Sequence, residues 1–213
     1  AINEKNVHDI ILSYLIQNCY IESSESFIAC TGMKRPANQL EIMEKRNRIL
    51  HNARVGNPLT AIDITEQLKQ DILEDNNSLL FDLLSLHFID LRACCKLLAF
   101  IESHVVGRIE ALEFARTKLS PFGKEPLYMY KLLEFMALLA YENPVESPSF
   151  HLLSLEYRQQ IVDCLNQTIH VYLNLPNETA MERLIKQALV VRQCLSQEDG
   201  PLPFFLTDFL KTR

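Results

Sequence analysis

The feature that most constrains this chain is a short amphipathic stretch near its N-terminus, residues 7–27. A first set of apolar side chains repeats there with the spacing of one helical face: Val7, Ile10, Ile11, Tyr14 and Leu15. A break at Asn18–Cys19 precedes a second short helix, which carries Tyr20 and Phe27. Two helices of this length bury too little surface to offset the chain entropy lost on folding. The shared apolar stripe therefore needs a cover, either a second copy of itself or the chain's own domain.

The rest of the chain has the pattern of an all-α protein. Five glycines and nine prolines gather where the helical spacing of apolar residues stops, and no proline falls between positions 59 and 120. Gly32 is expected to end the N-terminal hairpin as a helix C-cap. Further helices are predicted over 39–55, from 59 to about 68, from 77 through 91, and over 108–119, 127–141, 155–173 and 179–195.

Two of these helices and the C-terminal segment receive more specific expectations. The helix over 127–141 is expected to face inward with Leu133, Met136, Ala137 and Ala140. The helix over 179–195 is expected to carry an apolar stripe of Leu184, Ala188, Val191 and Leu195. The C-terminal segment is expected to dock through Phe204, Phe205 and Leu206, because so many exposed apolar side chains favour aggregation.

Composition excludes several classes of protein. With 21 Lys and Arg against 27 Asp and Glu the net charge is −6, and no basic block is present, so nucleic-acid binding is not expected. No apolar run reaches the roughly 18 residues of a membrane span, and the charged N-terminus lacks a cleavable signal pattern. Six cysteines without a CxxC pair are expected to be free thiols in a reducing compartment. We therefore expect a soluble, intracellular protein.

The motifs of common active sites are missing from the sequence. The two closest glycines are 16 residues apart, so no phosphate-binding loop is predicted. Neither a GxSxG elbow nor an HExxH or paired Cys/His spacing occurs. His87 and Asp90 have helical i, i+3 spacing, which is more often a packing contact than a catalytic pair. The sequence predicts no catalytic residue, no cofactor and no metal site.

Three segments in series carry a family resemblance. Tyr14-Leu15, Tyr20, Ser23-Ser24 and Phe27 have the spacing of the LisH motif, a dimerising helical hairpin, with Cys19 in the place of a usual glycine and hence a less tight turn expected. Residues 48–91 resemble the CTLH region that follows LisH in many eukaryotic proteins, and later segments resemble the CRA region. The matching residues are Gly56, Ala61-Ile62, Leu80-Phe81 and 88–91 for CTLH, and 111–115, 137–141 and Ser147-Pro148 for CRA.

The resemblance implies an all-α fold in which a LisH helical hairpin is followed by a CTLH and CRA helical bundle. The corresponding domains are a LisH motif over 5–33, a CTLH region over 39–106 and a CRA region over 107–213. Residues 92–109 are atypical, because relatives have a short turn there. This segment is expected to be helical, either as extra core or as an added partner-binding face; a continuous helix over 77–106 would be about 45 Å long.

The function that the resemblance implies is that of a non-catalytic scaffold with two separate pairing faces. Its partners would be itself or another LisH-CTLH protein, and other subunits of a CTLH (GID) ubiquitin-ligase complex, in the cytoplasm and nucleus, with no nucleic acid and no membrane. The LisH dimer interface would consist of Val7, Ile10, Ile11, Tyr14, Leu15, Tyr20 and Phe27. The CTLH-CRA packing or interface set is Leu80, Phe81, Leu84, Phe88, Leu91, Leu112 and Phe114.

Two alternatives come from other classes of protein. Plant corepressors that resemble TOPLESS use LisH-CTLH domains to recognise short peptide motifs, and an apolar groove with basic residues at its rim would favour this alternative. An enzyme is the third interpretation, and a deep polar pocket with strongly shifted pKa values would favour it.

Overall fold

The computed structural model describes residues 3–94, 101–141, 143–176 and 178–197. Within these residues every regular element is helical and no strand occurs, which confirms the predicted all-α class. The α-helices are α1 (Glu4–Gln17), α2 (Ile21–Thr31), α3 (Ala37–Arg54), α4 (Pro58–Leu68), α5 (Asp71–Glu74), α6 (Asn77–Cys94), α7 (Ile101–Phe114), α8 (Pro126–Ala140), α9 (Leu155–Tyr172) and α10 (Ala180–Gln197). A π-helical turn η1 (Ala115–Leu119) and the 3-10 turns η2 (Ser120–Lys124), η3 (Pro144–Glu146) and η4 (Phe150–Leu153) connect them.

The chain forms two compact units. The first contains the residues up to Met43 together with the described residues from Pro176 onward, and the second contains Glu44–Leu175. Contacts define these units, whereas the boundaries 5–33, 39–106 and 107–213 follow sequence motifs, so those motif boundaries stay a prediction.

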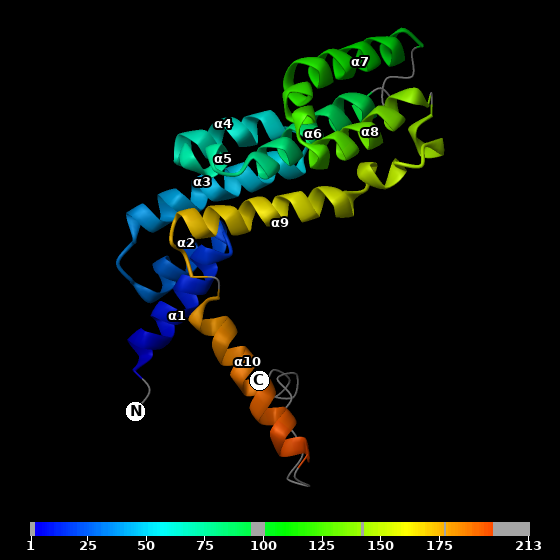
Figure 1. The fold of residues 1–213 in the computed structure, drawn as a ribbon. Coiled ribbons are helices and arrows are strands. Elements are labelled where there is room, and N and C mark those ends of the chain that lie inside the picture. Colours follow the sequence, from blue (N-terminus) through cyan, green and yellow to red (C-terminus); the bar gives the residue numbers. More distant parts are fainter. Residues whose placement is uncertain (1–2, 95–100, 142, 177, 198–213) are drawn as a thin grey trace. The chain divides into compact units, whose positions relative to one another are not determined.

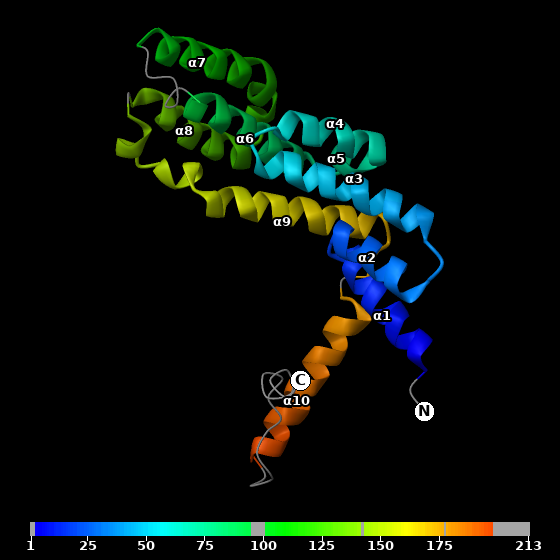
Figure 2. The same ribbon diagram turned by 180° about the vertical axis from the view of Figure 1, so that it is seen from behind.

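The second unit is built around α6. Phe81, Leu83 and Phe88 have no exposed surface, and their neighbours along the helix are also buried. A helix that is apolar on all sides must be enclosed by others, and α6 packs against α4, α5, α7, α8 and α9 (Figures 1 and 2). Aromatic contacts extend this core, because the Phe81 ring lies 4.9 Å from that of Tyr128 and 6.1 Å from that of Phe135.

The atypical segment folds back on α6. Helix α6 ends at Cys94, and α7 begins at Ile101 and packs along α6 (Figure 1), so the alternative of one helix over 77–106 is wrong. Packing explains the difference, since the apolar surface of α6 needs cover that a straight continuation would not supply. Ala111 of α7 is fully buried in this contact. Residues 95–100 lie outside the described part of the chain.

Helix α8 faces the core with other residues than the spacing predicts. Leu133 is 61% exposed and Ala140 is also exposed, so this expectation is wrong for these two residues. Met136 and Ala137 are half-buried, and Met136 packs against the core. The buried residues are Tyr128, Phe135 and Leu138. Since α8 is apolar around most of its circumference, spacing alone does not select a face, and the aromatic cluster at Phe81 does.

Two arginines cap the C-terminal end of α8. The guanidinium of Arg92, buried in α6, donates hydrogen bonds to the carbonyls of Leu138 (3.2 Å) and Tyr141 (2.6 Å). Arg108 of α7 donates to the carbonyl of Leu139 at 2.9 Å. The last carbonyls of a helix lack intrahelical donors and carry partial negative charge, so both cations stabilise this helix end. They also tie α8 to α6 and α7.

The first unit contains the predicted hairpin. Helices α1 and α2 pack together, and α1 also packs against α10. Gly32 is a left-handed C-cap of α2, as predicted. The turn at Cys19 is closed by the Tyr20 amide, which donates to the Leu15 carbonyl at 2.9 Å. That this turn is less tight than in relatives stays a prediction. Cys19 closes it by adopting a left-handed backbone conformation, φ +57°, that glycine adopts without strain.

A capping box starts α10 in the same unit. The Glu182 carboxylate accepts from the Thr179 amide at 2.7 Å, and the Glu182 amide donates to the Thr179 hydroxyl at 3.2 Å. The apolar stripe predicted for this helix lies on an exposed surface at Leu184 and Val191. The side chain of Leu195, and the docking set Phe204, Phe205 and Leu206, lie outside what the structure describes.

The left-handed backbone at Cys19 generates a stability prediction. Cys19→Ala and Cys19→Gly remove the same thiol and differ only in the β-carbon, which disfavours the left-handed conformation, so we expect the Gly variant to be about 1 kcal/mol more stable. Urea denaturation followed by circular dichroism measures the difference. The same pair at Cys30, an exposed position within α2, is the control, and there the Ala variant should be the more stable. An Ala variant at least as stable as Gly at position 19 would contradict the assignment of strain.

The buried capping arginine generates a second prediction. Lysine offers a point charge without the planar fork, so Arg92→Lys should lose a carbonyl contact and lower the free energy of unfolding by about 1–3 kcal/mol. Arg54→Lys, at an exposed position in the last turn of α3, is the matched control and should change it by less than about 0.5 kcal/mol. Equal effects of the two substitutions in urea denaturation would show that Arg92 does not cap α8.

Candidate protein-interaction surfaces

None of the seven residues predicted for the LisH interface is buried in the first unit. Val7 is 38% exposed and Tyr20 is 49% exposed. The remaining five are half-buried: Ile10, Ile11, Tyr14, Leu15 and Phe27. The chain therefore leaves much of the predicted apolar stripe in contact with solvent.

The hairpin packs inward through a different face of α1. Leu12 and Ile16 of α1 are buried against Leu40 and Met43 of α3, and Ser24 of α2 is fully buried beside them. The sequence analysis missed these positions. The i, i+4 pair of Leu12 and Ile16 is the signal that could have shown a second apolar face on α1.

A hollow of about 500 Å³ lies between α1 and α2. Leu15 and Phe27 supply its apolar lining, beside the polar residues Glu22, Ser23 and Ser26 and the thiol of Cys30. The Phe27 ring packs edge-on against His8 with centroids 5.6 Å apart. The hollow thus lies on the predicted stripe and exposes its two apolar residues.

Two tyrosines lie side by side at the hairpin turn. The rings of Tyr14 and Tyr20 are 6.1 Å apart, and the Tyr20 phenol, more than burial, raises the pKa of Tyr14. The Tyr14 phenol is therefore neutral at physiological pH. The two tyrosine rings form an amphipathic patch of the kind enriched in protein interfaces.

Helix α10 adds a second exposed apolar surface to the first unit. Its N-terminal end contacts α1, where Glu182 lies close enough to Tyr14 to influence its pKa. Beyond that end, five large apolar side chains are about half exposed: Leu184, Ile185, Leu189, Val190 and Val191. The sequence analysis identified only two of these five residues.

The residues predicted for CTLH-CRA packing or interface separate into three groups. Phe81, Leu84 and Phe88 are buried in the core of the second unit, while Leu80, Leu91 and Phe114 are half-buried against that core. Leu112 is different, since it is 53% exposed. Only Leu112 is therefore available to a partner as a largely exposed side chain.

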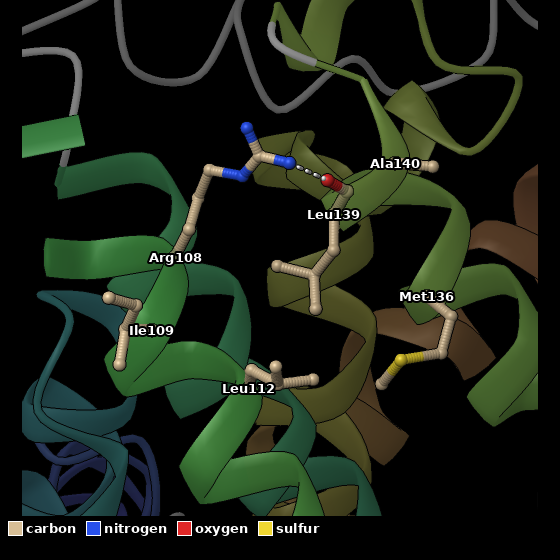
Figure 3. A pocket seen from close by; sticks show the side chains of 6 residues that line it. All are labelled: Arg108, Ile109, Leu112, Met136, Leu139 and Ala140. Carbon is tan, nitrogen blue, oxygen red and sulfur yellow. Dashed lines mark hydrogen bonds between the residues drawn. The ribbon is translucent and has the colours of Figure 1, made fainter. Parts of the chain in front are cut away.

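Leu112 lies in a groove between α7 and α8 (Figure 3). One hollow of about 470 Å³ and another of about 670 Å³ share Leu112 and Met136, so they form one continuous groove. Here "the α7/α8 groove" means the surface lined by Arg108, Ile109, Leu112, Ala115, Arg116, Ser120, Gly123, Lys124, Met129, Leu132, Leu133, Met136, Leu139 and Ala140.

The charged residues that line the α7/α8 groove are all basic. They are Arg108, Arg116 and Lys124, and no acidic residue is among the lining side chains that the structure describes. Arg108 donates to the Leu139 carbonyl across the groove (Figure 3). Arg116 and Lys124 are exposed and form no ion pair within the described part of the chain. This apolar groove with a basic rim was not apparent from the sequence.

The most perturbed ionisable groups lie elsewhere, in the packing of the second unit. Asp90 forms an ion pair with Arg158, which also donates to the Ala53 carbonyl at 2.9 Å, joining α6, α9 and α3. Burial raises the pKa of Asp90 and lowers that of His87. The His87 ring packs edge-on against Phe114, with 4.7 Å between the ring centroids, while the Asp90 carboxylate is paired with Arg158.

Within 3–94, 101–141, 143–176 and 178–197 no group of three or more His, Cys, Asp or Glu side chains is arranged to hold a metal ion. In the same ranges, none of the helices has both the length and the hydropathy of a membrane span.

Comparison with known proteins identifies the family. Residues 42–196 match the model of the CTLH/CRA domain that lies C-terminal to a LisH motif. The chain is 32% identical over 161 residues to a glucose-induced degradation protein 8 homolog of Nematostella vectensis, a match covering 75% of this chain and 66% of that protein, just under two thirds. It is 24% identical over 198 residues to a protein GID8 homolog of Arabidopsis thaliana, covering 92% and 76%. The family match spans most of the two units described above, and the chain belongs to the family of proteins with a CTLH/CRA domain C-terminal to a LisH motif.

Proposed function

We propose that this chain is a non-catalytic scaffold subunit of a GID (CTLH)-type ubiquitin-ligase complex, acting in the cytoplasm and nucleus. It joins other subunits through two faces, the LisH hairpin of the first unit and the CTLH-CRA surface of the second. The names of the Nematostella and Arabidopsis relatives, both GID8 homologs, support membership of such a complex.

The observation that carries this proposal is the incomplete cover of the hairpin. The inward face of α1 is already occupied by Leu12 and Ile16, while Tyr20 and Val7 on the predicted stripe stay exposed. Burial of a large apolar side chain contributes about 1.5–3 kcal/mol. A second LisH-CTLH chain that covers this stripe gains the part of that energy that corresponds to the still exposed area at each position, and a two-fold arrangement counts each position twice.

The character of the hollows supports a binding role over catalysis. Four groups in the second unit have displaced pKa values, and they line neither the α1/α2 hollow nor the α7/α8 groove: His87, Asp90, Tyr157 and Tyr172. Both surfaces are open and mainly apolar, as expected where another protein docks.

Peptide recognition is the second candidate function. The α7/α8 groove combines an apolar lining with the basic residues Arg108, Arg116 and Lys124, the feature that favours a module of corepressor type. In a scaffold the same groove serves as the CTLH-CRA face, so the two candidates differ in what occupies it.

Tyr20 gives the sharpest test of the hairpin interface. It is the N-cap of α2 and makes no side-chain capping bond, so Tyr20→Ser removes exposed apolar area while supplying a preferred capping residue. We expect the hairpin to stay folded and dimer affinity to fall at least about tenfold, because the contact is lost twice. Sedimentation velocity over a concentration series measures this.

The control for Tyr20 is Tyr130→Ser, at a 68% exposed tyrosine of α8 in the second unit. This substitution should leave the dimer unchanged. Affinity purification from cells extends the test to other chains, since ligase subunits should be lost with Tyr20→Ser and retained with Tyr130→Ser. Phe27→Ala should also weaken pairing, but Phe27 packs on the buried cluster of its own hairpin, so it is a less selective variant. Unchanged assembly with Tyr20→Ser would reject the hairpin interface.

A further inference from the structure

From the α7/α8 groove we infer a specific kind of partner: an amphipathic α-helix whose apolar face is flanked by acidic side chains. This inference rests on the proposed scaffold function and deepens it, because it gives the chemistry of what the CTLH-CRA face binds. Its first basis is the exposed apolar lining at Leu112, Leu133 and Met129, which intrachain packing leaves uncovered.

The groove favours a helix over an extended peptide. An extended segment must find partners for its backbone amides and carbonyls, usually at a strand edge. Within the described part of the chain no strand exists, and Ser120 is the one uncharged polar side chain that lines the groove. A helix satisfies its own backbone and needs only an apolar surface. From Met129 to Ala140 the α8 wall is about 16 Å long, about three helical turns.

The charges around the groove favour a partner with negatively charged side chains. Arg116 and Lys124 are exposed and unpaired among the described residues, and both flank the apolar lining near Leu112. Arg108 lines the other end of the groove, near Ala140 (Figure 3). Carboxylates beside the apolar face of a docked helix meet these cations, which gives both orientation and specificity.

The same charges disfavour a second copy of this groove as the occupant. In a two-fold pairing of groove with groove, Arg116 and Lys124 would face the identical cations of the other chain or lie close to them, and like charges brought together oppose association. The segment 198–213 offers little negative charge, since Glu198, Asp199 and Asp208 stand against Lys211 and Arg213, which leaves a net charge of −1. A separate acidic helix is the occupant that the groove complements.

A display library tests this inference without assuming a partner. The library holds amphipathic helices about four turns long, with fixed leucines on one face and all other positions randomised without charge bias. Selection uses the full chain, and counter-selection uses the full chain carrying Leu133→Ser, which removes an exposed lining residue and should not unfold α8. We expect groove-dependent binders, enriched in Asp and Glu beside the leucine face.

A selected peptide is then measured by fluorescence anisotropy. Arg116→Glu combined with Lys124→Glu should weaken binding about tenfold, and a peptide with Gln in place of Glu should lose the same factor and most of its salt dependence. Lys118→Glu is the matched control, since Lys118 is an exposed cation of the same turn that does not line the groove; it should change affinity less than about twofold.

Several outcomes would overturn the inference. Selection could yield no groove-dependent binder, or binders without enrichment in Asp and Glu. In the anisotropy measurement, Lys118→Glu could weaken binding as much as Arg116→Glu combined with Lys124→Glu, or a peptide of residues 198–213 could compete for the groove. Leu133→Ser could also change the oligomeric mass of the protein in solution, which would indicate that a second copy occupies the groove. Tyr20→Ser tests the hairpin interface independently of the groove. The inference about the groove can therefore be rejected while the proposed scaffold function is retained.

Discussion

Helices α1 and α8 are apolar on more than one face, and packing among the described residues covers only part of that apolar surface. In α1, Leu12 and Ile16 point into the chain, while Tyr14 and Leu15 stay partly exposed. In α8, Phe135 and Leu138 enter the core and Leu133 does not. The remaining apolar surface is a cost in water that a second polypeptide removes. The scaffold function proposed above rests on this constraint.

In the second unit, hydrogen bonds and an ion pair fix the helices that form the α7/α8 groove. Arg92 and Arg108 reach from α6 and α7 to the last carbonyls of α8, and the ion pair of Asp90 with Arg158 joins α6 to α9. Buried arginines bind carbonyls in a fixed geometry, so the groove walls do not depend on the groove being filled. A preformed groove binds a helix without the free-energy cost of ordering itself first.

The sequence predicts the parts of this structure that depend on local chemistry. The all-α class, the break at Asn18–Cys19 and the C-cap at Gly32 all follow from spacing and turn preferences. The buried face of a helix is harder to predict, because α8 has several apolar faces and only the contact with Phe81 determines which of them enters the core. The packing of α7 back along α6 depends on tertiary contacts, which the spacing of apolar residues does not show. The basic rim of the groove also depends on tertiary contacts, since Arg108, Arg116 and Lys124 are spread over 17 positions and gather only when α7, η2 and α8 pack.

The central claim is that another polypeptide covers the hairpin stripe, and site-specific photo-crosslinking tests it most directly. A benzophenone amino acid in place of Tyr20 reports whatever lies within reach of that position in cells. The account predicts a crosslink to a second protein chain, either another copy or a different LisH-CTLH subunit, with no such product from the same amino acid at exposed Leu155 of α9. Crosslinks from position 20 confined to the chain's own residues would contradict it.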